Sequence, residues 1–434
     1  MDLSALYGLY LEHPSVQTDT RLLQRGDIFF ALKGPSFNGN HFARQAIDEK
    51  GASYAVVDEP AAVTCDRCFL VDDVLLTLQG LARHHRRQLD IPVLAITGSN
   101  GKTTTKELTA AVLRKRFITP ATEGNLNNHI GVPLTLLRIS RSADMAIVEM
   151  GANHQKEIAA LCRIAEPTHG LITNCGKAHI EGFGGEEGVR KGKGELFDWL
   201  RAHSGIAFRN ADLPYLREMA RGIEKQVTYG TANADYCGQP VMDGQYLHVL
   251  LSDPEDGIEG LMLQTQLVGG YNFANVMSAV AVGLTFGVPA LSIAEAIAEY
   301  VPGNSRSQWV ERGATRIILD AYNANPTSMR AAIENFAGVP GEQKMLWLGA
   351  MKEMGEAERA EHEDLVKYID RFAWKDVVLV GEEFKEVRHS HRWFPTSAEA
   401  AEWVRANPPA DTTILLKGSR GSKMEVMLEA LPAV

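Results

Sequence analysis

The feature that most constrains the fold is a repeated alternation of short apolar runs with helical patterns. Val93–Thr97 predicts a buried strand, which a glycine turn joins to a helix from about Lys102. The runs that follow the same pattern farther along the chain are Met145–Glu149, Gly170–Thr173, Arg316–Leu319, Met345–Leu348, Val377–Val380 and Thr413–Leu416. Strands separated by helices form largely parallel sheets with helices on their faces, so the sequence predicts an α/β fold.

The chain has 434 residues, which is too long for one ordinary core and predicts roughly three domains. Pro92 opens the alternating pattern, and Pro302-Gly303 marks a hinge after which the alternation restarts. We therefore predict a small α/β domain over residues 1–90, a central parallel-sheet domain over 91–302 and a Rossmann-like α/β domain over 303–434. The other expected elements are strands near Asp27–Leu32 and Ser53–Asp58 and helices over Asp73–Gln88 and Gly269–Gly283.

Composition argues against several classes of protein. The net charge of −10 argues against a dedicated nucleic-acid binder, and Arg83–Arg87 (RHHRR) is expected to be one solvated helix face. No apolar run reaches the about 18 residues that a membrane span needs, and Met1–Ser15 lacks the pattern of a signal peptide. Five cysteines fit a reducing cytoplasm. Cys65 and Cys68 have zinc-like spacing, but no second Cys or His pair follows nearby, so we expect them to be inert.

The turn after Val93–Thr97 has the residues of a phosphate-binding loop. Gly98 and Gly101 allow a tight turn whose backbone N–H groups, at a helix N-terminus, can hold phosphate oxygens. Lys102 would pair with the β- and γ-phosphates, and the Thr103 hydroxyl would bind magnesium. The usual P-loop has a glycine one residue before Thr97, where this chain has isoleucine, so a plain turn in a Rossmann-like sheet is the alternative.

Eight segments occur in a characteristic order: TGSNGKTTTKE (97–107), GNLNNHIGVPLTLL (124–137), EMGANHQKEI (149–158), NCGKAHIEGFG (174–184), KGELF (193–197), PGNSRSQ (302–308), DAYNANPTS (320–328) and LLKGSRGSKME (415–425). Together they resemble the Mur ligases over essentially the whole chain. Within that family, the likeness is greatest to the ligases that add D-alanyl-D-alanine to UDP-N-acetylmuramoyl-tripeptide.

This resemblance implies an ATP-dependent amide ligase of peptidoglycan precursor synthesis. ATP would phosphorylate the tripeptide carboxylate, and the dipeptide amine would attack the acyl phosphate. Because that reaction gathers several anions, magnesium ions are expected as cofactors beside ATP. The expected partners are the two substrates, without nucleic acid or membrane, and we expect a cytoplasmic monomer. The first domain would bind the uridine nucleotide through segments such as Thr18–Arg21 and Gly26–Phe29.

Three residues of the central range are implied as catalytic groups together with Lys102. Glu149 ends the strand Met145–Glu149, where open α/β sheets place ligands, and would bind magnesium with Thr103. Asn125 would approach the acyl phosphate, and His179 would bind a second magnesium ion. The alternatives are a helix-capping carboxylate for Glu149, an amide that only stabilises a turn for Asn125 and a structural histidine.

Lys193 is expected on the apolar face of a helix over Glu187–Leu200, since it lies in register with Val189 and Leu196. Burying an unpaired ammonium is unfavourable, so a lysine there tends to become a neutral amine. The resemblance implies that Lys193 carries a carbamate that binds the second magnesium ion beside His179. In the alternative, its ammonium reaches solvent or pairs with a carboxylate such as Glu195 or Glu149.

The remaining implied contacts belong to the nucleotide. The residues are Gly98, Ser99, Asn100, Gly101, Lys102, Thr103 and Thr104 of the loop, then Asn272, Asn275, Arg306 and Asp320. Asn272 and Asn275 lie three apart and share a helix face, where an Asn pair can also satisfy neighbouring backbone. Tyr271 stands where the family usually has histidine, and Ala350 where it commonly has aspartate.

Lys417–Arg420 is a candidate end of the pocket for the dipeptide carboxylate, or a solvated loop. Asn325 precedes Pro326 and is suited to helix capping. Two other amide ligases of the same superfamily remain as alternatives: the enzyme that adds the third peptide residue, and a folylpolyglutamate synthase. A nucleotide-binding scaffold that has lost catalysis is the alternative from another class.

Overall fold

The computed structural model describes residues 3–252, 260–303 and 305–432. In this part of the chain, three sheets of four or more strands follow one another along the sequence. The first has the order β1-β2-β5-β6, and all of its paired strands are parallel. Its elements are β1 (Val16–Gln17), β2 (Ile28–Phe30), β5 (Tyr54–Val57) and β6 (Cys68–Leu70), with α1 (Leu3–Glu12), α2 (Ala43–Asp48) and α3 (Val74–Arg87).

The central sheet has the order β14-β13-β12-β11-β10-β9-β7-β8. The strands from β7 to β12 pair in parallel, and β13 and β14 add an antiparallel edge. Its strands are β7 (Val93–Thr97), β8 (Ala146–Glu149), β9 (His169–Ile172), β10 (Ile206–Asn210), β11 (Lys225–Gly230), β12 (Tyr236–Met242), β13 (Leu247–Leu251) and β14 (Met262–Gln264). Its helices are α4 (Lys102–Arg114), α5 (Gly131–Leu137), α6 (Glu157–Ala165), α7 (Ile180–Phe183), α8 (Glu186–Ala202), α9 (Pro214–Met219), α10 (Phe273–Thr285) and α11 (Ala290–Glu299).

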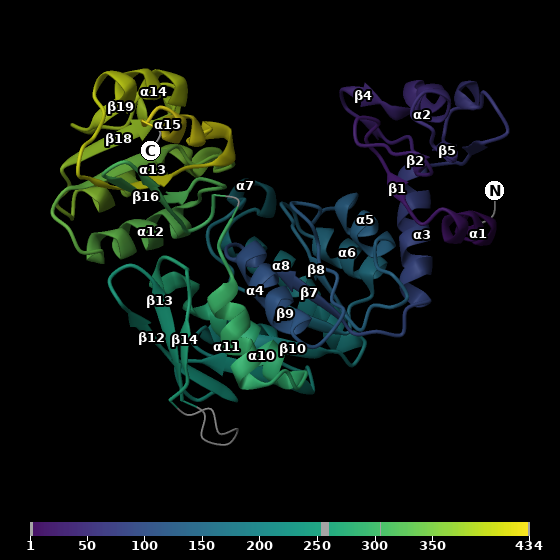
Figure 1. Cartoon of the computed structure of the whole chain (residues 1–434), viewed down its shortest axis with the longest axis horizontal. Coiled ribbons are helices and arrows are strands. Elements are labelled where there is room, and N and C mark those ends of the chain that lie inside the picture. Colours follow the sequence, from purple (N-terminus) through teal and green to yellow (C-terminus); the bar gives the residue numbers. More distant parts are fainter. Residues whose placement is uncertain (1–2, 253–259, 304, 433–434) are drawn as a thin grey trace.

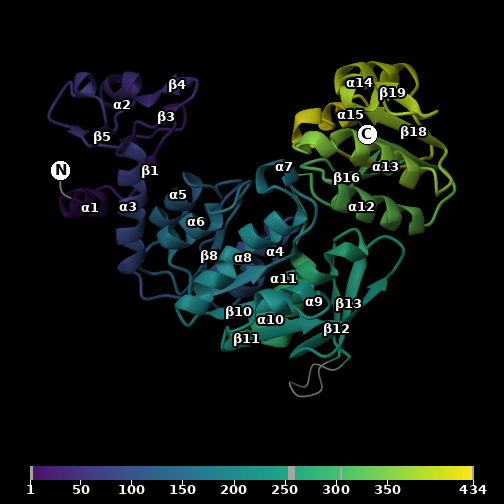
Figure 2. The same cartoon turned by 180° about the vertical axis from the view of Figure 1, so that it is seen from behind.

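The C-terminal sheet has the order β15-β16-β20-β17-β18-β19, parallel except for the β15–β16 pair. Its strands are β15 (Gln308–Arg312), β16 (Thr315–Asp320), β17 (Lys344–Gly349), β18 (Asp376–Val380), β19 (Arg392–Phe394) and β20 (Thr413–Lys417). Its helices are α12 (Pro326–Gly338), α13 (Glu358–Ile369), α14 (Ser397–Ala406) and α15 (Glu425–Glu429). The first and C-terminal sheets lie at opposite ends of the central part of the molecule (Figures 1 and 2).

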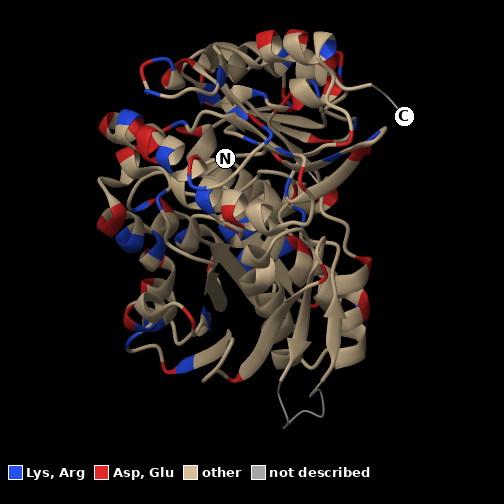
Figure 3. Ribbon diagram, turned by 90° about the vertical axis from the view of Figure 1, so that its left-hand side faces the viewer, with Lys and Arg blue, Asp and Glu red and all other residues tan. Residues whose placement is uncertain are grey.

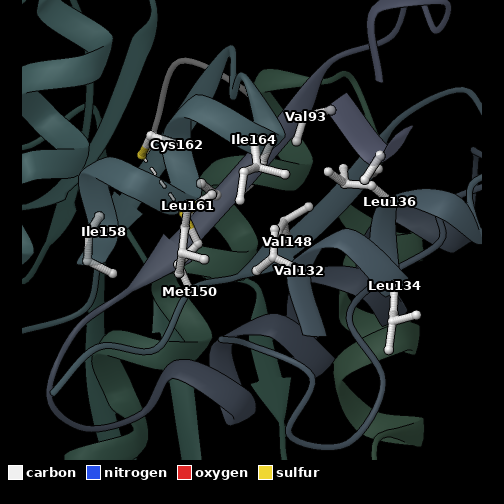
Figure 4. Close-up of a cluster of buried hydrophobic side chains, with 14 of the residues drawn as sticks. Val93, Val132, Leu134, Leu136, Val148, Met150, Ile158, Leu161, Cys162 and Ile164 are labelled. Atoms are coloured by element: carbon white, nitrogen blue, oxygen red, sulfur yellow. Dashed lines mark hydrogen bonds between the residues drawn. The ribbon is translucent and has the colours of Figure 1, made fainter. Parts of the chain in front are cut away.

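The core of the central part is formed where apolar strands meet apolar helix faces. Val93 of β7 and Val148 of β8 are fully buried against side chains of α5 and α6. Figure 4 shows this cluster, with the sulfur atoms of Cys162 and Met150 in contact across it. Because β7 is buried on both faces, its carboxyl end is fixed, and the loop that follows starts from a rigid point.

The predicted α/β fold is confirmed, and the expected strands are found within one or two residues of their predicted limits. The apolar helix expected over Gly269–Gly283 begins later, at Phe273, after a 3-10 turn over Gly270–Asn272. The three sheets lie within the three predicted ranges, but the boundaries at 90 and 302 stay predictions. None of the described helices is long and apolar enough to cross a membrane.

The prediction of one solvated basic face over Arg83–Arg87 is wrong for His85 and Arg86, which are buried. The Arg86 guanidinium donates to the carbonyl oxygen of Ala165 at 3.0 Å and so satisfies the end of α6. Along the ribbon drawn in Figure 3, the positions of Lys and Arg are interspersed with those of Asp and Glu.

Candidate active site

The loop between β7 and α4 has a conformation that needs glycine at two positions. Gly98 has φ +143°, and a Cβ there would lie 2.0 Å from Thr173 Oγ1. Gly101 has φ +80°, and a Cβ there would lie 2.5 Å from Asn275 Oδ1. The loop is therefore closely packed against the strand and helix beside it, as a backbone that binds phosphate must be.

The polar side chains of the loop hold it in place. Ser99 Oγ donates to the Gly176 carbonyl oxygen at 2.9 Å. The Asn100 backbone N–H donates to Asn174 Oδ1 at 3.1 Å, while Asn325 Nδ2 donates to Asn100 Oδ1 at 2.7 Å. Asn100 therefore links the loop to the C-terminal sheet, because Asn325 caps α12.

Lys102 folds back onto the loop. Its Nζ donates to the carbonyl oxygens of Gly98 at 2.7 Å and Ser99 at 3.2 Å. Burial lowers the pKa of Lys102 to about 8, although the Glu149 carboxylate opposes this shift. An anionic group beside Lys102 would stabilise its ammonium, so the site favours a phosphate.

Glu149 has one oxygen that is held and one that is free. The side chain is buried, with 1% of the residue exposed. Oε1 accepts from Asn127 Nδ2 at 2.7 Å and from Thr103 Oγ1 at 3.3 Å. Oε2 is buried and has no hydrogen-bond partner. A buried carboxylate oxygen without a donor is poorly solvated, and a cation would satisfy it.

This arrangement fits a magnesium ion. The Thr103 hydroxyl and Glu149 Oε2 are oxygen ligands of the kind that Mg²⁺ prefers. Among the described residues, no group of three or more His, Cys, Asp or Glu side chains is close enough to hold a metal. The other ligands would therefore come from substrate oxygens and water, which magnesium usually retains.

Asn127 holds the Glu149 carboxylate, and the approach of Asn125 to the acyl phosphate stays a prediction. Asn125 is exposed in the loop before α5, and its carbonyl oxygen accepts from the Asn127 N–H at 2.8 Å. Sequence reasoning missed Asn127, because it lies in the segment GNLNN beside two other asparagines. The three amides are chemically alike, and no residue pattern indicates which of them reaches Glu149.

His179 lies at the start of α7 with φ +53°, a left-handed conformation uncommon for a residue with a side chain. Its imidazole contacts the carboxylate of Glu353, which also has a positive φ of +62°. Burial lowers the pKa of His179, while the Glu353 carboxylate raises it. The pair joins the central part of the molecule to the C-terminal part.

Lys193 is buried in α8, with 1% of the residue exposed, as its spacing predicts. Its Nζ donates to the Ala152 carbonyl oxygen at 2.9 Å and lies 4.8 Å from the centre of the Phe183 ring. Glu195 accepts instead from backbone N–H groups at the start of α6, among them that of Ala159. Burial, chiefly, lowers the pKa of Lys193 to about 7, and the Lys102 charge adds to this effect. Lys193 therefore forms no ion pair with Glu195 or Glu149, and its desolvated ammonium loses its proton more readily than that of an exposed lysine.

Asn272 and Asn275 are buried and bonded to each other. Asn275 Nδ2 donates to Asn272 Oδ1 at 2.9 Å, and Thr105 Oγ1 donates to Asn275 Oδ1 at 3.0 Å. Asn272 Nδ2 also donates to the Val268 carbonyl oxygen at 2.9 Å. The pair thus satisfies local backbone and braces the start of α4.

Arg306 and Asp320 come from the chain that enters the C-terminal sheet. The Arg306 guanidinium lies 3.7 Å from the centre of the Tyr322 ring, and its Nε is buried without a partner. Asp320 accepts from the Lys417 ammonium at 2.5 Å and from the Ser307 N–H at 3.2 Å. The unpaired Arg306 Nε gives the site a donor that an anion could use.

One cavity of about 1170 Å³ brings most of these residues together. Its walls come from both the central and C-terminal parts, and its lining residues all lie between Ser99 and Gly421. The predicted site residues among them are Ser99, Asn100, Gly101, Lys102, Thr103, Thr104, Asn125, Glu149, His179, Asn272, Asn275, Arg306 and Asp320. Gly98 and Lys193 lie behind the lining, and the first sheet contributes no residue to it. Tyr271, Lys352, Lys417 and Arg420 complete the polar wall.

Two family models match the chain: the Mur ligase middle domain over residues 96–283, and the Mur ligase glutamate ligase domain over residues 305–420. The UDP-N-acetylmuramoyl-tripeptide–D-alanyl-D-alanine ligase of Bacillus subtilis is 34% identical, over 96% of this chain and 92% of its own. A crystal structure of MurF from Acinetobacter baumannii has a TM-score of 0.85 at 30% identity, covering 96% of this chain and 92% of that one. MurF from Thermotoga maritima, in complex with ADP, has a TM-score of 0.84 at 26% identity, covering 97% of each chain. The phosphate loop beside the buried Glu149 carboxylate agrees with these matches. The matches show that the chain belongs to the Mur ligase family.

Proposed function

We propose that this protein joins D-alanyl-D-alanine to UDP-N-acetylmuramoyl-tripeptide with ATP, in peptidoglycan precursor synthesis in the cytoplasm. The observation that carries the proposal is the cavity in which the phosphate loop, the free oxygen of Glu149 and the unpaired Nε of Arg306 meet. These groups suit the transfer of a phosphoryl group, and the similarity to ligases of that name extends over nearly the whole chain.

The roles of the residues follow from their contacts. The tripeptide carboxylate would take the γ-phosphoryl group of ATP, and the dipeptide amine would displace phosphate from the acyl phosphate. Lys102 and Arg306 would hold the phosphoryl oxygens, because both present cations at the cavity. Asn125 would approach the acyl phosphate, and Asn272 and Asn275 would lie beside the nucleotide. Magnesium would neutralise phosphate charge when bound.

We infer that Thr103 and Glu149 hold one magnesium ion and that His179 and Lys193 hold a second, with Lys193 as a carbamate. The neutral amine would attack the carbon of carbon dioxide and lose one proton, which leaves an anion. Support comes from the burial of Lys193, from its lowered pKa and from its lack of an ion pair with any described carboxylate. The domain division at 90 and 302, and a monomeric state, belong to the same proposal.

The carbamate is tested with Lys193→Ala and with Lys191→Ala, whose side chain is exposed on the same helix. We expect Lys193→Ala to be inactive and to regain activity with added short carboxylic acids, while Lys191→Ala keeps wild-type activity. Labelled bicarbonate should give a carbamate NMR signal in the wild type and in Lys191→Ala, but not in Lys193→Ala. Full activity of Lys193→Ala without any acid would reject the carbamate.

The substrate assignment is tested by measuring phosphate release from ATP with UDP-muramoyl-tripeptide and a panel of amines. We expect release only when the tripeptide and D-alanyl-D-alanine are both present. Equal activity with a single amino acid would reject this assignment. Turnover of a UDP-muramoyl-dipeptide with one amino acid would instead indicate the ligase that adds the third residue, and turnover of glutamate with a folate would indicate a folylpolyglutamate synthase. ATP binding without any amine-dependent turnover would indicate a scaffold.

A further inference from the structure

Two cysteine sulfur atoms lie side by side at the start of β6, in the first sheet, which contributes no residue to the cavity. Cys65 Sγ and Cys68 Sγ are 3.8 Å apart. The Cys68 N–H donates to the Cys65 carbonyl oxygen at 3.0 Å, which closes a four-residue turn before β6. Such a turn brings its end Cα atoms within about 7 Å, and a disulfide needs a Cα separation of roughly 4.4–6.8 Å. The backbone is therefore already suited to a bond between these two residues.

The two thiols differ in access. Cys65 is exposed, whereas Cys68 is buried as the first residue of β6. Only Cys65 can meet a reagent from solution, and Cys68 lies behind it, within reach of its sulfur. The Thr64 hydroxyl is 3.7 Å from Cys68 Sγ and can donate to it. Because exchange depends on access to the attacking thiol, a small disulfide would react first at Cys65, and Cys68 would then be the resolving thiol.

We propose that Cys65 and Cys68 form a reversible intramolecular disulfide by exchange with a low-molecular-weight disulfide. The Cys65 thiolate attacks one sulfur of the small disulfide, forms a mixed disulfide and releases one small thiolate. The Cys68 thiolate then attacks Cys65 Sγ, forms the protein disulfide and releases the second small thiolate. Two protein thiols are oxidised, the small disulfide is reduced to two thiols, and the two protons pass to the released thiolates.

The other three cysteines, all among the described residues, lack this arrangement. Burial raises the pKa of the Cys162 thiol far above its usual range, and its sulfur contacts Met150 Sδ. Burial likewise raises the pKa of Cys175 to about 12. Cys237 donates to the Ala234 carbonyl oxygen, and no second cysteine is near it. These thiols therefore serve as internal controls.

The test treats the folded protein with oxidised glutathione, alkylates the remaining thiols after unfolding and measures peptide masses. In the wild type we expect the peptide with both cysteines to be two hydrogens lighter and free of alkyl groups and glutathione. In Cys68→Ser we expect glutathione to stay on Cys65. In Cys65→Ser we expect both Cys68 and the other thiols to be alkylated. Dithiothreitol should restore both wild-type thiols.

Two outcomes would overturn the proposal. Glutathione that remains on Cys65 in the wild type would mean that Cys68 does not resolve the mixed disulfide. Full alkylation of both residues in the wild type, under conditions that oxidise a free dithiol peptide of the same segment, would mean that the folded turn prevents the reaction. The serine variants should keep wild-type ligase activity, because neither cysteine lines the cavity.

Discussion

At the scale of single residues, the site depends on how the two oxygens of Glu149 are used. Asn127 and Thr103 both bond Oε1, so the carboxylate plane is fixed and Oε2 is turned away from hydrogen-bond donors. A loop amide of this kind acts through the carboxylate that it orients. Asn127 is therefore a positioning residue.

We predict that Asn127→Ala weakens metal binding by about 10-fold or more, because orienting partners of metal ligands typically contribute that much. Mn²⁺ can replace Mg²⁺ as a probe, and its binding in the presence of a non-hydrolysable ATP analogue can be followed by electron paramagnetic resonance. Asn128→Ala is the matched control, since Asn128 Oδ1 accepts from Ile130 and Gly131 N–H groups at the start of α5. Equal Mn²⁺ affinity in the two variants would contradict the role of Asn127.

Lys193 gives a pH-dependent prediction. Its pKa is lowered from 10.5 to about 7 in the folded chain, so between these values the unfolded chain binds more protons at this residue. The contribution of Lys193 to the free energy of unfolding therefore increases with pH across this window, by at most about 1.4 kcal/mol per pH unit. The wild type should gain stability relative to Lys193→Met from pH 7 to 10 in carbon dioxide-free buffer, as urea unfolding can show. If the free energies of unfolding of the wild type and Lys193→Met differ by the same amount at every pH, the Lys193 amine is not desolvated.

At the scale of elements, the sequence predicts the parallel strands well because each is a short apolar run between helices. β7 is found with its predicted limits, and Lys193 faces inward on α8 as its spacing requires. The antiparallel strands β13 and β14 and their partner β12 were not predicted, because β12 is mostly exposed or half-buried and has no continuous apolar run. Asn272 was placed on a helix, but it lies in the 3-10 turn before α10.

The prediction that Asn325 caps a helix is confirmed, and it has a second consequence. Asn325 Oδ1 accepts from the Ser328 N–H, and Ser328 Oγ accepts from the Asn325 N–H, while Asn325 Nδ2 donates to Asn100. We predict that Asn325→Ala lowers the stability of the protein by about 1 kcal/mol and also raises the KM for ATP severalfold.

The control for Asn325→Ala is Thr396→Ala on α14. Thr396 caps its helix by accepting from the Glu399 N–H, and it has no link to the phosphate loop. Both variants should unfold at lower urea concentration by similar amounts, and only Asn325→Ala should change the KM for ATP. A raised KM in both would mean that stability alone explains the effect.

At the scale of the whole molecule, the central and C-terminal parts meet through apolar contacts, such as those of Val268 with the C-terminal core, and through polar contacts at the cavity rim. Lys177 Nζ pairs with Glu361 Oε1 of α13 at 2.7 Å, and the Lys177 N–H donates to Thr327 Oγ1 of α12 at 3.1 Å. His179 contacts Glu353 beside them. Because a half-exposed ion pair is worth about 0–1 kcal/mol, the arrangement of the two parts is only weakly fixed by such pairs.

We predict that Lys177→Met shifts the two parts away from the arrangement seen in the structure, by up to about fivefold in population, since about 1 kcal/mol corresponds to that ratio. Fluorescence energy transfer between a label on α4 and one on α13 should show a longer mean distance in the variant. High salt should lengthen this distance in the wild type and have little effect in Lys177→Met, because salt screens the ion pair.

Arg359→Met is the matched control, because Arg359 pairs with Glu363 within α13 and makes no contact across the cavity rim. If Arg359→Met lengthens the distance as much as Lys177→Met does, the effect comes from a change in α13 itself, and the Lys177–Glu361 pair does not hold the two parts together.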